Sequence, residues 1–159
     1  MNGAEPARAP PETSRIEELM GRAREAARLS PNRVRQVGAV LVSADGRASI
    51  TCCNTFPKGV RDIEERHAGD GRFVWMEHAE RNAIFQAASC GLATEGATLA
   101  TTFFPCIDCA RAIVQSGIAY LCTPHPALDD PVWGEAFLRS RVIVEEGGVT
   151  MCFVDAPDP

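Results

Sequence analysis

The sequence predicts an α/β protein in which one sheet lies between layers of helices. Two observations predict this class. Strand and helix patterns alternate along most of the chain, in the order α-β-β-α-β-α-β-α-β. The first two strands, 38–43 and 48–53, are joined by Asp45-Gly46, a turn signal typical of an antiparallel hairpin. We therefore expect a sheet covered on both faces, with an antiparallel first pair.

The chain is expected to form one domain behind a short tail. Residues 1–12 are rich in proline, alanine and charge, which predicts a disordered segment. Residues 13–159 are enough for a single compact domain with its own core. Within it, Thr13 or Ser14 is expected to cap the first helix, and Ser30-Pro31-Asn32 to end it.

The later elements follow from local patterns of the same kind. A long irregular segment separates the hairpin from the next helix, and stretches of that length inside a compact domain are usually functional or flexible. The predicted order is irregular 54–76, helix 78–88, strand 98–103, helix 106–115, strand 118–123, a helix opened by Asp129-Asp130-Pro131, and strand 149–154.

Composition excludes several classes of function. The chain has 16 basic and 21 acidic residues and a net charge of −5, which disfavours a polynucleotide partner. It has no apolar run long enough for a signal peptide or a membrane helix. Its seven cysteines are an odd number, which favours free thiols in a cytoplasmic protein. We expect Cys90, Cys122 and Cys152 to pack as small hydrophobic residues.

Two short motifs carry the chemistry of the chain. His78-Ala79-Glu80 is followed further on by Pro105-Cys106-Ile107-Asp108-Cys109, and each motif opens a predicted helix. The positive end of a helix dipole favours the thiolate forms of Cys106 and Cys109, which are the forms that bind zinc. With His78 they supply three ligands, so a fourth position stays open for water, as in catalytic zinc sites. Zinc can lower the pKa of such a water to about 7.

Glu80 is the predicted catalytic residue. It lies two residues after His78, in the first turn of the same predicted helix, where its carboxylate can reach a water at the metal without displacing it. From there it can accept the proton of that water, pass it to a ring nitrogen and then protonate a leaving amine. Glu80 is therefore expected to act as the proton shuttle and His78 as a ligand.

Other interpretations of these motifs exist. Cys-x-x-Cys in a cytosolic chain can be a redox pair or half of a structural zinc knuckle, but no second Cys-x-x-Cys completes a four-thiolate site. A binding or scaffold module with purely structural zinc is another alternative. Such a site needs no proton shuttle, so Glu80 argues against it.

The paired motifs are the signature of zinc-dependent deaminases. The chain resembles the cytidine/deoxycytidylate deaminase family and is most similar to the dCMP deaminases within it. This resemblance implies a three-layer α/β/α cytidine deaminase-like fold with a five-stranded mixed sheet. It also implies one catalytic zinc ion per subunit and a homo-oligomer. The residues that carry the resemblance are 36–40, 54–59, 78–84 and 104–110.

The resemblance also implies contacts with a small-molecule substrate. The expected contacts are Asn54 with the sugar or base, the Ala79 N–H with a base carbonyl, Val37, Gly38 and Ala39 at the floor of the base pocket, Phe104 at its edge, and Lys58 and Arg61 with a 5′-phosphate.

The expected function is hydrolytic deamination of a cytosine nucleotide, such as dCMP, to the uracil nucleotide with release of ammonia. The alternative is a free nucleoside, guanine or another aminated heterocycle, such as a pterin-like base, at the same zinc site. Editing of tRNA or single-stranded nucleic acid is disfavoured by the acidic balance and by an aromatic content of only 6%.

Overall fold

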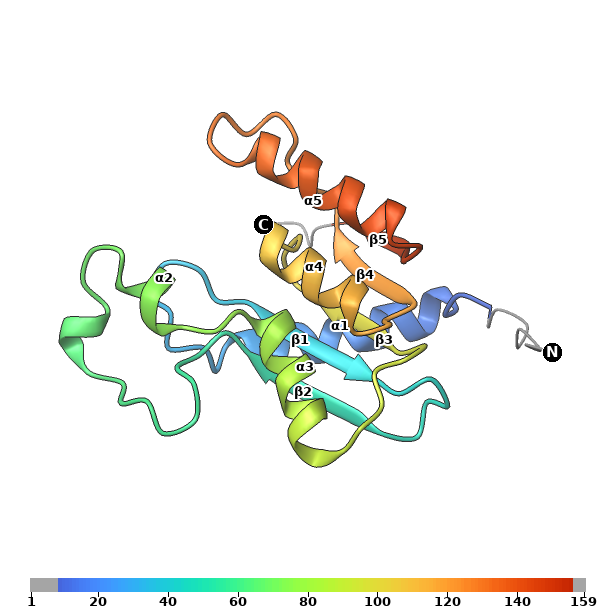
Figure 1. The fold of residues 1–159 in the computed structure, drawn as a ribbon, viewed down its shortest axis with the longest axis horizontal. Coiled ribbons are helices and arrows are strands. Elements are labelled where there is room, and N and C mark those ends of the chain that lie inside the picture. Colours follow the sequence, from blue (N-terminus) through green and yellow to red (C-terminus); the bar gives the residue numbers. More distant parts are fainter. Residues whose placement is uncertain (1–8, 156–159) are drawn as a thin grey trace.

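The computed structural model describes residues 9–155 and contains a five-stranded sheet in the order β2-β1-β3-β4-β5 (Figure 1). Strand β1 pairs antiparallel with both β2 and β3, whereas β3–β4 and β4–β5 are parallel. The sheet is therefore mixed, and its first pair is the predicted hairpin. The strands are β1 Gly38–Val42, β2 Ser49–Cys53, β3 Thr98–Thr101, β4 Tyr120–Pro124 and β5 Thr150–Val154.

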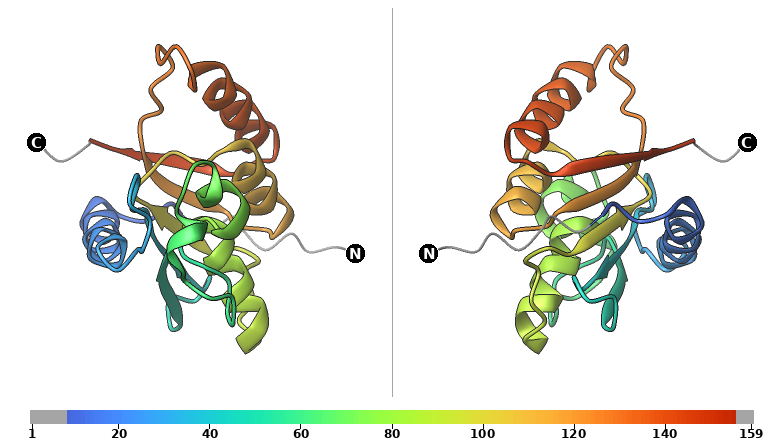
Figure 2. Two further views of the ribbon diagram at one scale, coloured as in Figure 1. Left: turned by 90° about the vertical axis from the view of Figure 1, so that its left-hand side faces the viewer. Right: turned by 90° about the vertical axis from the view of Figure 1, so that its right-hand side faces the viewer.

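The helices form two layers, which confirms the predicted three-layer arrangement (Figure 2). Helix α1 covers one face of the sheet, and α3, α4 and α5 cover the other. No helix in the described part of the chain is both long and apolar enough to cross a membrane. The helices are α1 Thr13–Ala27, the 3₁₀ turn η1 Glu64–Arg66, α2 Gly71–Trp75, α3 Ala79–Cys90, α4 Ile107–Gln115 and α5 Gly134–Glu146.

Strand β1 lies at the centre of the core because all five of its residues are apolar and buried. Its side chains alternate between the two faces, as pleating requires. Ala39 and Leu41 pack with the small residues of α3, whereas Val40 and Val42 pack with Leu19 of α1. One continuous apolar strand therefore joins both halves of the core.

Three local predictions differ from the structure. Glu12, rather than Thr13 or Ser14, holds the N-cap position of α1, and no side chain caps this helix. Helix α5 begins at Gly134, because the Asp130 carboxylate accepts the N–H groups of the two residues before Gly134 and holds them in a turn. Cys90 is exposed at the end of α3, so its predicted packing is wrong. In the predicted tail, residues 1–8 lie outside the described residues.

Gly38 sets the distance between β1 and α1. A Cβ atom added there would lie 1.8 Å from the carbonyl oxygen of Ala23 and 2.7 Å from the backbone nitrogen of Ala27. Both contacts are to helix backbone, which a rotamer change cannot relieve. Gly38 is therefore a packing residue that lets the first helix approach the sheet.

We expect Gly38→Ala to lower the free energy of unfolding by about 1–3 kcal/mol, the usual cost of overpacking a core. Thermal denaturation followed by circular dichroism should show a midpoint lower by several degrees. Gly21→Ala is the matched control, because nothing lies within 4 Å of its added Cβ atom. Within helix α1 that change should be neutral or stabilising. Equal stability of the two variants would contradict the packing role of Gly38.

Candidate active site

The starts of α3 and α4 lie next to each other on one face of the sheet. His78 is the N-cap residue of α3 and Cys106 is that of α4, so both motifs open helices as predicted. Hydrogen bonds hold each start in place. The Cys52 thiol donates to the Ala79 carbonyl, tying α3 to β2, and the Ser140 hydroxyl donates to the Pro105 carbonyl, tying α4 to α5. The positive ends of two helix dipoles therefore meet at one point.

His78, Cys106 and Cys109 form a cluster of three potential metal ligands whose donor atoms all lie within 4.8 Å of one another. The His78 Nδ1 atom is 3.5 Å from each of the two sulfur atoms. With Zn–N near 2.1 Å and Zn–S near 2.3 Å, tetrahedral geometry places nitrogen and sulfur about 3.6 Å apart. The three side chains therefore fit a zinc ion in both donor type and spacing.

The protonation of the cluster also suits a cation. A hydrogen bond from the Cys109 thiol and the nearby His78 ring lower the pKa of Cys106 to about 3, against the opposing effect of burial. The same hydrogen bond, together with burial, raises the pKa of Cys109. These shifts favour the thiolate form of Cys106 beside the imidazole. A bound metal ion would favour the thiolate form of both cysteines.

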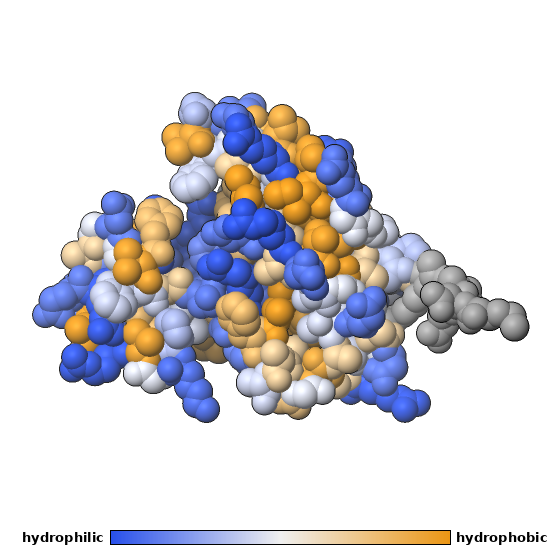
Figure 3. Space-filling model, in the orientation of Figure 1, coloured by the Kyte–Doolittle hydropathy of each residue, from blue (hydrophilic) through white to orange (hydrophobic). Residues whose placement is uncertain are grey.

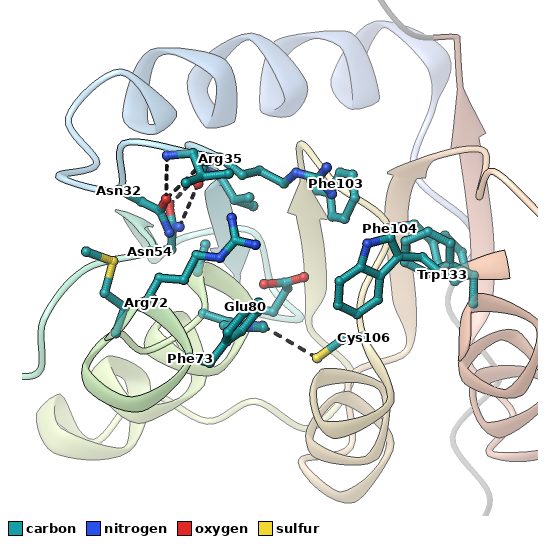
Figure 4. A pocket seen from close by; sticks show the side chains of 16 residues that line it. Asn32, Arg35, Asn54, Arg72, Phe73, Glu80, Phe103, Phe104, Cys106 and Trp133 are labelled. Carbon is teal, nitrogen blue, oxygen red and sulfur yellow. Dashed lines mark hydrogen bonds between the residues drawn. The ribbon is translucent and has the colours of Figure 1, made fainter. Parts of the chain in front are cut away.

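Glu80 is buried directly beside this cluster, with 3% of its surface exposed. Burial raises the pKa of its carboxyl group to about 7, although its own backbone N–H and the His78 charge oppose the shift. The side chain nevertheless lines the open pocket (Figure 4). A carboxyl group with this pKa, next to a metal site and facing a pocket, is suited to both accepting and donating a proton near neutral pH.

Arg81 joins the two helices behind the metal cluster. Its guanidinium lies 2.6 Å from the Glu77 carboxylate and 3.9 Å from that of Asp108 in α4. Its Nε atom is buried and has no hydrogen-bond partner among the described residues. The positive charge of Arg81 lies close enough to both ligand cysteines to interact with them electrostatically. Arg81 therefore offsets part of the negative charge that two thiolates would bring.

A pocket opens above Glu80, and four of the eight predicted substrate contacts line it (Figure 4). Aromatic side chains make up much of its wall: Phe73, Phe103, Phe104, Trp133 and Phe137. The sequence-predicted residues among its lining are Val37, Asn54, His78, Ala79, Glu80, Phe104 and Cys106.

Asn54 has a structural task in this pocket. Its Oδ1 atom accepts the N–H of Val37, and its Nδ2 group donates to the carbonyl of Arg35. The buried amide thus fixes the segment that leads into β1. Each of its two polar atoms retains capacity for one further hydrogen bond, since an amide offers two donors and two acceptor lone pairs.

Four of the predicted contacts are not brought to the pocket lining. Gly38 faces α1, and Ala39 is fully buried in the core between β1 and α3. Lys58 and Arg61 are exposed on the irregular segment, away from the pocket. The structure therefore gives no support to Lys58 or Arg61 as phosphate ligands.

The pocket instead contains two arginines that sequence reasoning missed, Arg35 and Arg72. Arg35 precedes β1 and lies beside Phe103, which is distant in sequence. Arg72 belongs to α2, a helix of five residues without a side-chain cap, which leaves little signal in the sequence. Phe73, also in α2, and Trp133, the N-cap residue of α5, line the pocket as well. Only the tertiary structure reveals these contacts.

The fold and this site together are those of a zinc-dependent hydrolase, with three potential zinc ligands beside a buried carboxyl group. Residues 13–123 match the family described as the cytidine and deoxycytidylate deaminase zinc-binding region. The chain therefore belongs to the cytidine and deoxycytidylate deaminase family, whose members are zinc-dependent hydrolases that act on C–N bonds.

Individual relatives agree with this assignment. The chain is 32% identical to an uncharacterized deaminase of Aliivibrio fischeri over 120 residues, which cover 75% of this chain and 79% of that protein. It is 59% identical to the deoxycytidylate deaminase of Enterobacteria phage T4 over 69 residues, which cover 42% of this chain but only 35% of the phage enzyme. The crystal structure of the dCMP deaminase from cyanophage S-TIM5 with dCMP and dUMP shares the fold, with a TM-score of 0.69 at 22% identity over 91% of this chain and 100% of that chain.

Proposed function

We propose that this protein hydrolytically deaminates a cytosine nucleotide of the dCMP type to the uracil nucleotide and releases ammonia. The observation that carries the proposal is the buried Glu80 carboxyl group, which lies beside the cluster of His78, Cys106 and Cys109 at the base of an aromatic pocket. The deoxycytidylate deaminases among its relatives support the choice of substrate.

The residues of the site divide the reaction between them. A zinc ion held by His78, Cys106 and Cys109 would supply the Lewis acid that makes the attacking water acidic. Glu80 accepts one proton of that water and delivers it to the ring nitrogen next to the reacting carbon; it then accepts the remaining proton of the added hydroxyl group and passes it to the departing amine. The oxygen of water becomes the new carbonyl oxygen, and the amine leaves as ammonia.

Substrate orientation follows from the start of α3. Ala79 is the first residue of this helix, so its N–H has no partner within the helix and can donate to a base carbonyl. Phe104 is almost fully buried and holds an edge-to-face contact with Phe137, so it forms a rigid wall for a flat ring. Val37 completes the apolar surroundings, and the buried Asn54 amide offers its remaining hydrogen-bond capacity.

Ammonia release by the zinc-loaded protein tests this function. We expect dCMP to be turned over with a higher kcat/KM than deoxycytidine, cytosine, guanine or an aminopterin. Comparing dCMP with CMP measures the preference between deoxyribose and ribose. Ammonia from guanine or a pterin alone would overturn the cytosine assignment while leaving the zinc chemistry intact. Release from no member of this panel would overturn the proposed function itself.

The proposal extends to the setting of the enzyme. We infer that residues 13–159 act as a single deaminase domain, that the protein works in the cytoplasm, and that it forms a homo-oligomer. Seven free thiols suit a reducing compartment.

The homo-oligomer is supported by two exposed apolar side chains of α5, Leu138 and Val142, which give a surface for a second copy of the chain. Figure 3 shows apolar side chains on the face of the molecule that includes α5. Sedimentation equilibrium measures the number of subunits.

A further inference from the structure

Two guanidinium groups extend into the same pocket from different parts of the chain. Arg35 comes from the segment that leads into β1, and Arg72 comes from α2 in the long irregular segment (Figure 4). Figure 4 shows both side chains above Glu80, with the Arg72 guanidinium between Asn54 and the Glu80 carboxyl group. Positive charge is therefore concentrated on the side of the pocket that lies away from the metal cluster.

Each of these arginines rests on the face of an aromatic ring. The Arg35 Cζ atom lies 4.1 Å from the centroid of the Phe103 ring, and the Arg72 Cζ atom lies 4.5 Å from that of Phe73. A guanidinium that stacks through its flat face keeps its N–H groups free at the edge. These contacts therefore favour the observed positions of both guanidinium groups without using their N–H donors.

No carboxylate in the described part of the chain forms an ion pair with either guanidinium. Within residues 9–155, Arg33 is paired with Glu64 and Arg81 with Glu77, whereas Arg35 and Arg72 take part in no ion pair. The Asp130 carboxylate interacts electrostatically with Arg35 but forms no ion pair with it. Its Oδ1 atom accepts hydrogen bonds from two backbone N–H groups. Two positive charges that line one pocket and form no ion pair among the described residues are suited to bind an anionic group of a ligand.

The backbone around both arginines is held before any ligand binds. The Arg35 carbonyl accepts from Asn54, and its N–H donates to the Asn32 side chain. The segment that carries Arg72 is fixed by an Arg66 guanidinium 4.1 Å from the Trp75 ring and by a contact of 2.5 Å between His67 and the Asp62 carboxylate. Little ordering is then left for the moment of binding.

We propose that Arg72, with Arg35 facing the same space, determines specificity by binding the phosphate of a nucleoside 5′-monophosphate. This inference rests on the proposed function and adds the residues that make the enzyme prefer a nucleotide over a nucleoside. The planar guanidinium forms paired hydrogen bonds with phosphate oxygens, which a point charge such as lysine cannot reproduce. The assignment replaces Lys58 and Arg61, which lie outside the pocket.

The test compares dCMP with deoxycytidine in five zinc-loaded variants: Arg72→Gln, Arg72→Lys, Arg35→Gln, Arg61→Gln and Lys58→Gln. We expect Arg72→Gln and Arg35→Gln each to lower the ratio of kcat/KM for dCMP to that for deoxycytidine by about 10-fold or more, the usual effect of removing a hydrogen bond to a charged group. The loss should appear mainly in KM for dCMP. Arg61→Gln and Lys58→Gln should keep the wild-type ratio, and Arg72→Lys should recover only part of it.

The substrate ratio protects this test from a general loss of structure, because damage to the fold lowers both rates together. An unchanged ratio in Arg72→Gln, or an equal fall in Arg61→Gln, would overturn the role of Arg72. A wild-type protein that deaminates neither compound would instead overturn the proposed function. In that case, calorimetric titration with dUMP and deoxyuridine decides separately whether Arg72→Gln removes the preference for the phosphate.

Discussion

Replacing Glu80 with glutamine is expected to lower kcat for ammonia release by about 10²–10⁴-fold, the range that one positioned proton-transfer group contributes. Glutamine has the same size and fits the same buried space, but it cannot accept the proton of the attacking water. The ligand cluster is unaffected by the change, so zinc content should stay at one ion per subunit. The measurements are steady-state ammonia release and elemental analysis of the same sample.

Glu17→Gln provides the control for this experiment, because Glu17 is exposed on α1 on the opposite face of the sheet. That variant should keep wild-type kcat and melting temperature. If Glu80→Gln keeps its activity as well, Glu80 is not the proton shuttle. If it loses zinc together with activity, the carboxyl group supports the metal site rather than the chemistry.

Removal of the metal is the second change with a large expected effect. Cys109→Ser should release zinc and lower kcat/KM by at least about 10²-fold, because several kcal/mol of transition-state stabilisation depend on the ion. The same loss should follow treatment of the wild-type protein with a chelator, and added zinc should restore activity only in the wild type. The melting temperature should also fall, since a ligand that binds only the folded state stabilises it.

Cys90→Ser is the matched control for this change, because Cys90 is an exposed cysteine outside the metal cluster. It should keep both zinc and activity. Full activity of a metal-free wild-type protein would contradict the assignment of the cluster as a catalytic zinc site.

The metal cluster could be predicted because its signal is local. Each motif places its ligands within a few residues at the start of a helix, and the structure brings His78 to 3.5 Å from both sulfur atoms. The hairpin and the alternation of strands and helices are also properties of short windows of sequence. The mixed sheet and the two helical layers follow from this alternation.

The wall of the pocket could not be predicted in the same way. Arg35 meets Phe103 only because β1 and β3 are neighbours in the sheet, and no local pattern encodes that contact. Helix α2 has five residues, too few for a periodic apolar pattern, so Arg72 lies in a segment that the sequence marks only as irregular. Lys58 and Arg61 resemble phosphate ligands by residue type, but burial and direction decide the role of a side chain.

The irregular segment between β2 and α3 separates two tasks within this small protein. The metal cluster is built on helices that are anchored in the core. Arg72 and Phe73 instead belong to the irregular segment, which the contacts of Arg66 with Trp75 and of His67 with Asp62 hold in place. Substitutions in the irregular segment can therefore change which substrates bind and leave the residues of the metal cluster unchanged. One scaffold can in this way give rise to enzymes that share a reaction and differ in substrate specificity.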